Sequence, residues 1–181
     1  ALPIFVAVDA AATMGQTVRL ALTVTDAAGG EWELASRSIP VGLMPLVTDP
    51  VDLAAAFDAS AFYHGVDGDD LLLAVVSHTD HDADQEVDVF LDTDLDGDYD
   101  HAVSTIDTAS DTFIGGVFIW DGGWTQTSQP ARFDFTGGTD HLLFGVPIAE
   151  LGNLVQARAY VVVKDVTEVY SDFVPDDPGV T

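Results

Sequence analysis

The 181-residue chain contains no cysteine, which excludes disulfide bridges, thiolate zinc sites, iron–sulfur clusters and cysteine nucleophiles. Long apolar runs are also missing, so no segment is predicted to cross a membrane as a helix. The first residues show no charged stretch followed by an apolar one, so a secreted form of the chain would already have lost its signal. A secreted protein without disulfides needs another source of stability, and bound calcium is one.

Basic residues are scarce as well. Five Lys and Arg stand against 31 Asp and Glu, giving a net charge of -26. A chain this acidic repels phosphate groups, so we expect no nucleic-acid partner and no insertion into membranes. Of the acids, 26 are Asp, a residue that favours turns and short metal-binding loops over helices. A halophilic surface is an alternative explanation, but 13 acids fall between Asp67 and Asp100, and such clustering favours a local role.

Alternation of apolar and polar residues with a period of two dominates the sequence and predicts β-strands. QTVRLALTVTD has four apolar residues on one face, and after a Gly-rich turn EWELASRSI returns as the second strand of a hairpin, with Trp32 and Leu34 on one face. In EVDVFLDTD, Phe90 breaks the alternation, so the pattern does not decide which face of this strand points toward the core. Further strands are expected in PIFVAVD, DLLLAVVSHTD, HAVSTI, TFIGGVFIWD, ARFDFTG, HLLFGVP and QARAYVVVKD. Gly, Asp and Pro separate them at short intervals, which is typical of an all-β, antiparallel β-sandwich, either jelly-roll or immunoglobulin-like.

We expect three parts along the chain. Residues 1–43 form an N-terminal β-hairpin block, residues 44–50 a linker, and residues 51–181 the sandwich. The linker holds two prolines, which cannot lie in a central strand. The first block supplies three strands at most, which is marginal in water, so it must pack on the sandwich or on another molecule. One short helical turn is expected around Pro147 to Leu151.

The stretch DTDLDGDYD places an aspartate at every second position from 92 to 100, the spacing of a calcium loop. Calcium takes six to eight hard oxygen ligands, and residues one, three and five of a tight loop can face one ion while a glycine at six permits the turn. The predicted ligands are Asp92, Asp94 and Asp96, followed by the backbone carbonyl of Asp98 and by Asp100 through a water.

This loop resembles that of an EF-hand but departs from it in two places. Val103 stands where a bidentate Glu belongs, and the flanking segments are strand-like rather than helical. We therefore interpret it as a calcium loop that joins two strands. Five carboxylates so close together would repel each other strongly without a cation, which argues against a merely solvated turn.

A second acidic stretch, HTDHDADQE, follows an expected strand. Asp80, Asp82 and Asp84 repeat the alternate spacing without the glycine, and they would form either a second calcium site or extra ligands for the first. The neighbouring His78 and His81 are a weak signal for zinc, because two histidines beside hard carboxylates do not make a typical transition-metal site. The segment GVDGDD predicts a hairpin turn from its Gly and Asp content.

Motifs that carry catalysis are missing. The sequence holds no nucleophile elbow, HExxH, P-loop or dinucleotide fingerprint, and we expect no enzymatic activity. Lys164 lies on an expected strand and is interpreted as a solvent-facing residue rather than a base. Trp120 and Trp124 flank a Gly-Gly turn: exposed and coplanar they would stack on sugar rings, whereas burial in a sandwich core would make them structural.

Residues 51 to 178 as a whole resemble the β-sandwich accessory modules of secreted bacterial and archaeal enzymes. These include the DOMON and family-nine carbohydrate-binding-module group and modules that follow subtilisin-like protease domains. The similarity lies in DGDDLLLAVVSHTD, VDVFLDTDLDGDYD and VYSDFVPDDPG. The segment GQTVRLALTVTDAAGGEWELASRSIPVG resembles the last strands of an immunoglobulin-like domain that lacks its early strands.

These observations lead to two functional hypotheses. The first is a non-catalytic extracellular structural module, stabilised by calcium, that assembles with copies of itself into a surface layer or fibre by strand exchange. The apolar segment Ala1 to Asp9 is the candidate donor strand. The alternative is a carbohydrate- or substrate-binding accessory domain of a secreted hydrolase such as a subtilisin-like protease, with polysaccharide as its partner.

Overall fold

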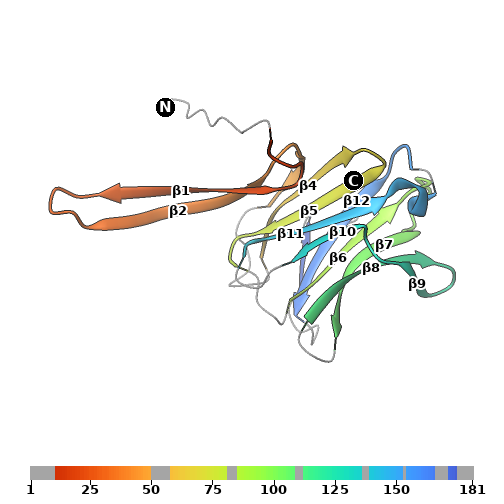
Figure 1. The fold of residues 1–181 in the computed structure, drawn as a ribbon. Helices are drawn as coiled ribbons and strands as arrows, with labels where there is room; N and C mark the ends of the chain where they lie inside the picture. The colour runs from red at the N-terminus through yellow and green to blue at the C-terminus, as the bar shows by residue number, and fades with distance from the viewer. Residues whose placement is uncertain are drawn as a thin grey trace.

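A computed structural model describes residues 11–49, 58–80, 85–108, 112–135, 139–152, 154–165 and 171–174. Strands dominate these residues and pair antiparallel, which confirms the predicted all-β sandwich (Figure 1). The five-stranded sheet runs in the order β10 (Arg132–Phe135), β11 (His141–Pro147), β5 (Asp70–Ser77), β4 (Ala59–Asp67) and β3 (Met44–Thr48). The six-stranded sheet runs in the order β13 (Ser171–Val174), β12 (Arg158–Asp165), β6 (Gln85–Asp92), β7 (His101–Thr108), β8 (Thr112–Trp120) and β9 (Trp124–Ser128).

The main core lies between these two sheets. It contains large side chains such as Phe62 and Phe144, both at most 1% exposed. In β6 the residues Val87, Val89 and Leu91 point into this core, so Phe90 faces outward and the inner face of β6 is settled. The predicted helical turn is confirmed as η1 (Ile148–Leu151), which adds Leu151 to the core.

A second apolar cluster includes Leu72, Ala74, Val76 and Leu143, which alternate along β5 and β11 with residues of the main core. Both faces of β5 are buried, which explains why its sequence DLLLAVVS is almost continuously apolar. The prediction of a buried strand here is confirmed. Met14 packs against this second cluster, and this contact ties the N-terminal block to the sandwich.

The linker expected at residues 44–50 contains a strand. Met44–Thr48 forms β3, which pairs with β4 and belongs to the five-stranded sheet. Pro45 is compatible with this place because β3 is an edge strand, with one side that needs no hydrogen-bond partner. The alternation also did not predict three further strands, β4, β9 and β13. Their residues either do not alternate clearly between apolar and polar or form very short strands.

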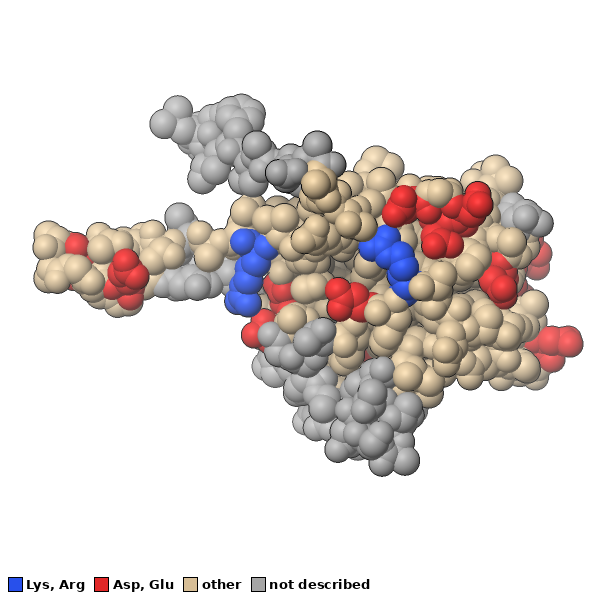
Figure 2. Space-filling view, viewed as in Figure 1, with Lys and Arg blue, Asp and Glu red and all other residues tan. Residues whose placement is uncertain are grey.

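β1 (Thr17–Thr25) and β2 (Glu31–Pro40) pair only with each other among the described strands. We call this hairpin the arm, and it projects from the sandwich (Figure 1). Figure 2 shows the same projection; on that face Lys and Arg form two small patches, whereas Asp and Glu are spread over the surface. The register shifts between Leu22 and Thr23, a β-bulge that the alternation did not predict. The strand expected at residues 3–9 lies outside the described residues.

The base of the arm is anchored to the sandwich at several points. Ser38, 1% exposed, donates a hydrogen bond from Oγ to Oδ1 of Asp140. Arg132 Nη2 donates to the carbonyl of Met14 over 2.8 Å, and Arg19 Nη1 lies 3.8 Å from Asp80 Oδ1. No helix in the described part of the chain is long and apolar enough to span a membrane.

Replacing Gly15 by alanine should loosen this anchor. Gly15 has a φ of +80°, and a Cβ there would lie 2.9 Å from Leu143 Cδ2 in the second apolar cluster. The matched control for backbone strain alone is Gly68. It has a φ of +64°, and beyond its chain neighbours no atom of the described residues lies within 4 Å of the position that a Cβ would take. Gly15→Ala should lower the melting temperature about 2–8 °C further than Gly68→Ala, because it adds about 1–2 kcal/mol of overpacking. Equal melting temperatures in differential scanning calorimetry would show that the anchor is not tightly packed.

Candidate metal centre

The loop from Asp92 to Asp100, here called the aspartate loop, joins β6 to β7. These strands pair antiparallel, with Leu91 opposite His101, so the predicted strand-flanked loop is confirmed. Gly97 has a φ of +104°, which explains why glycine stands at the sixth position. Leu95 also adopts a left-handed φ of +64°, a conformation uncommon for a residue with a side chain.

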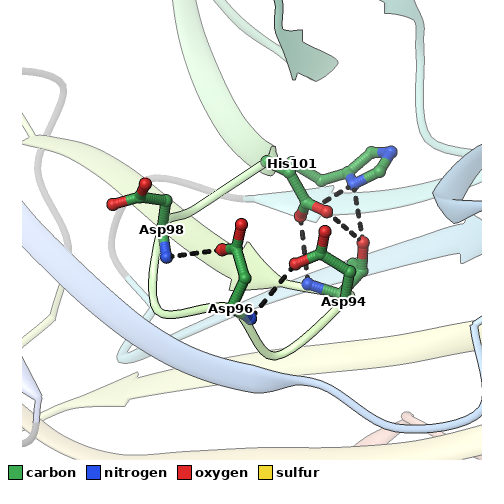
Figure 3. Close-up of polar contacts among 6 residues, drawn as sticks. Asp94, Asp96, Asp98 and His101 are labelled. Atoms are coloured by element: carbon green, nitrogen blue, oxygen red, sulfur yellow. Dashed lines mark hydrogen bonds and ion pairs between the residues drawn. The ribbon is translucent and has the colours of Figure 1, made fainter.

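The carboxylates at positions one, three and five of the aspartate loop converge. Asp92, Asp94 and Asp96 each offer an oxygen, and these atoms all lie within 4.8 Å of one another. Backbone amides hold the turn: Asp96 N–H donates to Asp94 Oδ1 over 3.2 Å, and Asp98 N–H donates to Asp96 Oδ1 over 2.9 Å (Figure 3). These three side chains therefore lie together, as the spacing predicted.

Asp92 is the most buried member of the group, at 1% exposed. Its Oδ2 accepts a hydrogen bond from Gly97 N–H at 3.2 Å and lies 3.6 Å from Arg158 Nη1. Its Oδ1 is buried and has no hydrogen-bond partner among the described residues. A buried carboxylate oxygen without a partner is costly, and a bound cation is one way to compensate it.

The last two predicted ligands lie differently. The Asp98 carboxylate is directed away from Asp94 (Figure 3), as expected of a residue predicted to act through its carbonyl. The Asp100 carboxylate accepts hydrogen bonds from Thr93 N–H at 3.0 Å and Thr93 Oγ1 at 2.5 Å, and contacts His101 Nδ1 at 3.1 Å. Burial alone would raise the pKa of Asp100, but the bonds from Thr93 and His101 outweigh it and hold this pKa below its ordinary value.

The second acidic stretch contributes one described residue. Asp80 is near Arg19 of the arm and does not belong to the group of Asp92, Asp94 and Asp96. Asp82 and Asp84, like His81, lie outside the described residues. His78 Nε2 is 3.1 Å from the Asp49 carbonyl and 3.9 Å from Asp58 Oδ1. The segment GVDGDD does form the turn of the β4–β5 hairpin, as predicted.

Beside the aspartate loop, aromatic side chains from separate elements line an open pocket of about 670 Å³. Trp120 and Trp124 belong to it and are 48% and 39% exposed. The complete set, here called the ring pocket, is Phe90, Tyr99, Trp120, Trp124 and Tyr160 together with Asp94, Asp96, Asp98 and Asp100. The sequence signal for Trp120 and Trp124 was their place at a turn. Phe90 was a further clue in the sequence, because it is an aromatic residue on the otherwise polar face of β6 that also carries Glu86 and Asp88.

The two tyrosines of the ring pocket remain neutral phenols near neutral pH. Burial, and after it the negative charge of Asp92, raises the pKa of Tyr99 above its ordinary value. Burial also raises the pKa of Tyr160, with smaller contributions from Tyr99 and Asp88. The aromatic wall therefore carries no charge of its own.

Ser38, Asp140 and His141 also meet at the base of the arm, but in an order unsuited to nucleophilic catalysis. Ser38 Oγ donates to Asp140 Oδ1, and Asp140 Oδ1 lies 3.5 Å from His141 Nδ1. A serine nucleophile needs a base such as histidine directly beside its hydroxyl. The serine is also 1% exposed, so this group links the arm to the sandwich.

Comparison with known proteins adds no relative: no protein-family model matches the chain, and neither does any curated protein. The similarity to accessory modules of secreted enzymes therefore stays a prediction.

Proposed function

We propose that this chain is a non-catalytic extracellular structural module, stabilised by calcium, that assembles with copies of itself. The observation that carries the calcium part is the convergence of the Asp92, Asp94 and Asp96 carboxylates. Asp92 in addition has a buried oxygen, Oδ1, without a hydrogen-bond partner among the described residues. Hard carboxylate oxygens suit calcium better than zinc, which favours nitrogen and sulfur ligands. An exported chain without cysteine gains from the metal the stability that disulfides provide elsewhere.

The arm supports the assembly part of the proposal. Cross-strand pairing places Val18 opposite Ile39 and Val24 opposite Trp32, so these apolar residues share one face of a two-stranded sheet. Trp32 is 52% exposed and Val24 43%. Isolated two-stranded sheets are marginal in water, and an exposed apolar face on one marks a surface that another molecule covers.

Charge indicates why a second copy fits this face. The arm carries two of the five basic residues of the chain, Arg19 and Arg37, and only three of the 31 acids. Two copies with a net charge of -26 repel each other least where they meet through their arms. Among the described strands, β1 and β2 each pair on one side only, and the other edge of each can accept a further strand such as the candidate donor at residues 1–9. Multi-angle light scattering with and without calcium tests the proposal, because it measures molar mass directly.

A binding module is the second candidate function, and the exposure of Trp120 and Trp124 favours it. A carbohydrate- or substrate-binding accessory domain would use such rings as a platform. The two tryptophans meet at 64°, however, and a flat polysaccharide chain stacks best on coplanar rings. The structural module is therefore the proposal we prefer.

A non-catalytic module should show no turnover. We expect the purified chain to release product from peptide, ester and glycoside substrates no faster than buffer does. Ser38 donates its hydroxyl proton to Asp140 rather than to His141. The Thr93 hydroxyl lies 3.2 Å from His101 Nδ1, but it donates to the Asp100 carboxylate. The measurement is an end-point chromogenic assay over a day with calcium present. Reproducible turnover that His141→Gln abolishes would contradict this expectation and make the base of the arm an active site.

A further inference from the structure

The ring pocket is built from elements that are distant in the sequence. Phe90 comes from β6, Tyr99 from the aspartate loop, Trp120 from β8, Trp124 from β9 and Tyr160 from β12. The pocket is open to solvent, and the exposed fractions of Trp120 and Trp124, 48% and 39%, leave ring surface free for a ligand. A structural role in the sandwich core does not account for five aromatic side chains gathered outside that core.

The rings line the open pocket at angles to one another rather than forming one flat platform. Trp120 and Trp124 meet at 64° with centroids 5.3 Å apart, and Phe90 and Trp124 meet at 56° with centroids 5.5 Å apart. Tyr99 and Tyr160 meet at 58°, whereas Phe90 and Tyr160 are close to parallel at 17°. Surfaces inclined to one another can contact a compact group from several sides, and a compact cation is attracted to each ring face.

The charge of the ring pocket favours a positively charged ligand. Four aspartates line it, and the described lining residues include no Lys or Arg. Even with one calcium ion bound, the five aspartates of the aspartate loop keep a net negative charge. An anionic ligand is repelled, a neutral sugar gains nothing from this field, and a cation is attracted by the carboxylates as well as by the rings.

We propose that the ring pocket binds an alkylated ammonium group. Its source is either a small soluble quaternary ammonium compound or the side chain of a methylated lysine on another protein. A quaternary ammonium is only weakly hydrated compared with a metal ion, so it loses little on entering an aromatic pocket. The inference is independent of the assembly role of the arm, and it holds whether or not the aspartate loop carries calcium.

The test uses the full chain in calcium and a pair of ligands of the same shape. Choline carries the positive charge, and 3,3-dimethyl-1-butanol is its neutral counterpart. Isothermal titration should give saturable binding of choline at least about tenfold tighter than that of the alcohol. A trimethyl-lysine peptide distinguishes the two sources: tighter binding than choline indicates a protein ligand, and equal or weaker binding a small molecule.

Variants locate the site. Trp120→Leu and Trp124→Leu should each weaken choline binding roughly 2- to 30-fold, whereas Trp32→Leu on the arm removes an equally exposed tryptophan and should leave binding unchanged. Because the choline comparison is made on the unaltered chain, it stands even if a variant fails to fold. Three results would overturn the proposal. They are equal binding of choline and the alcohol, saturable sugar binding that depends on Trp124, and no binding of either ligand up to about 50 mM, roughly the dissociation constant of a contact worth about 2 kcal/mol.

Discussion

Chelating calcium should lower the melting temperature of this protein by about 5–11 °C. A ligand present at about 100 times its dissociation constant stabilises the folded state by roughly 2.7 kcal/mol, and each kcal/mol shifts the midpoint of a protein of this size by about 2–4 °C. The physical cause is the group of Asp92, Asp94 and Asp96, whose carboxylates each bring one oxygen within 4.8 Å of the others, together with the unpartnered, buried Oδ1 of Asp92. Differential scanning calorimetry in calcium and in EGTA measures the difference.

The double substitution Asp94→Asn with Asp96→Asn separates the effect of the metal on stability from that of the turn. An asparagine oxygen can still accept the backbone hydrogen bonds from Asp96 and Asp98, so the loop keeps its turn while two charges disappear. In calcium the variant should melt well below the unaltered chain, and in EGTA no lower, because repulsion among the carboxylates is reduced. The control is Asp121→Asn with Asp134→Asn, at two exposed positions outside the loop. It removes the same amount of charge and should keep the full drop in melting temperature in EGTA. A chain that melts at one temperature in both buffers has no calcium site here.

Disrupting the apolar face of the arm should weaken assembly strongly. We expect the unaltered chain in calcium to show a molar mass well above the 19.1 kDa of one copy, because calcium neutralises part of the charge that separates the copies. Val24→Thr with Trp32→Thr keeps residues compatible with a strand but removes apolar surface that is about half exposed. Burying that surface is worth on the order of 1 kcal/mol per residue, so the association constant should fall at least about 30-fold.

The matched control is Ala21→Ser with Thr23→Ser, on the opposite face of the same strand, which should assemble normally. A chain that lacks residues 1–9 tests the donor strand separately: loss of assembly in this truncation, with the arm intact, assigns the contact to strand exchange. Light scattering on all four chains at equal concentration decides between the arm face, the donor strand and both. If every chain stays at the mass of one copy at high concentration in calcium, the assembly proposal is wrong and the binding-module function takes its place.

The local features of this protein follow from the order of its amino acids alone. Alternation with a period of two was enough to predict most strands, because each strand of a sandwich must turn every second side chain toward the core. The aspartate loop was predictable for a similar reason: the spacing of Asp92, Asp94 and Asp96 and the glycine at 97 act within one turn of the backbone. β3 was missed because Pro45 argues against a central strand, and only the neighbouring strands could show that this one lies at an edge.

Which distant residues meet depends on how the strands pack in three dimensions. The direction of Phe90 depends on which face of β6 meets the opposite sheet, and the ring pocket depends in addition on β8, β9 and β12 lying beside the aspartate loop. The contact of Ser38 with Asp140 joins residues 102 positions apart, and no local pattern encodes it. The exposure of the arm is likewise a tertiary result, because an alternating strand looks the same in sequence whether its apolar face is covered by its own sheet or awaits another molecule. Local propensity acts over a few residues, whereas burial is decided by the packing of the whole chain.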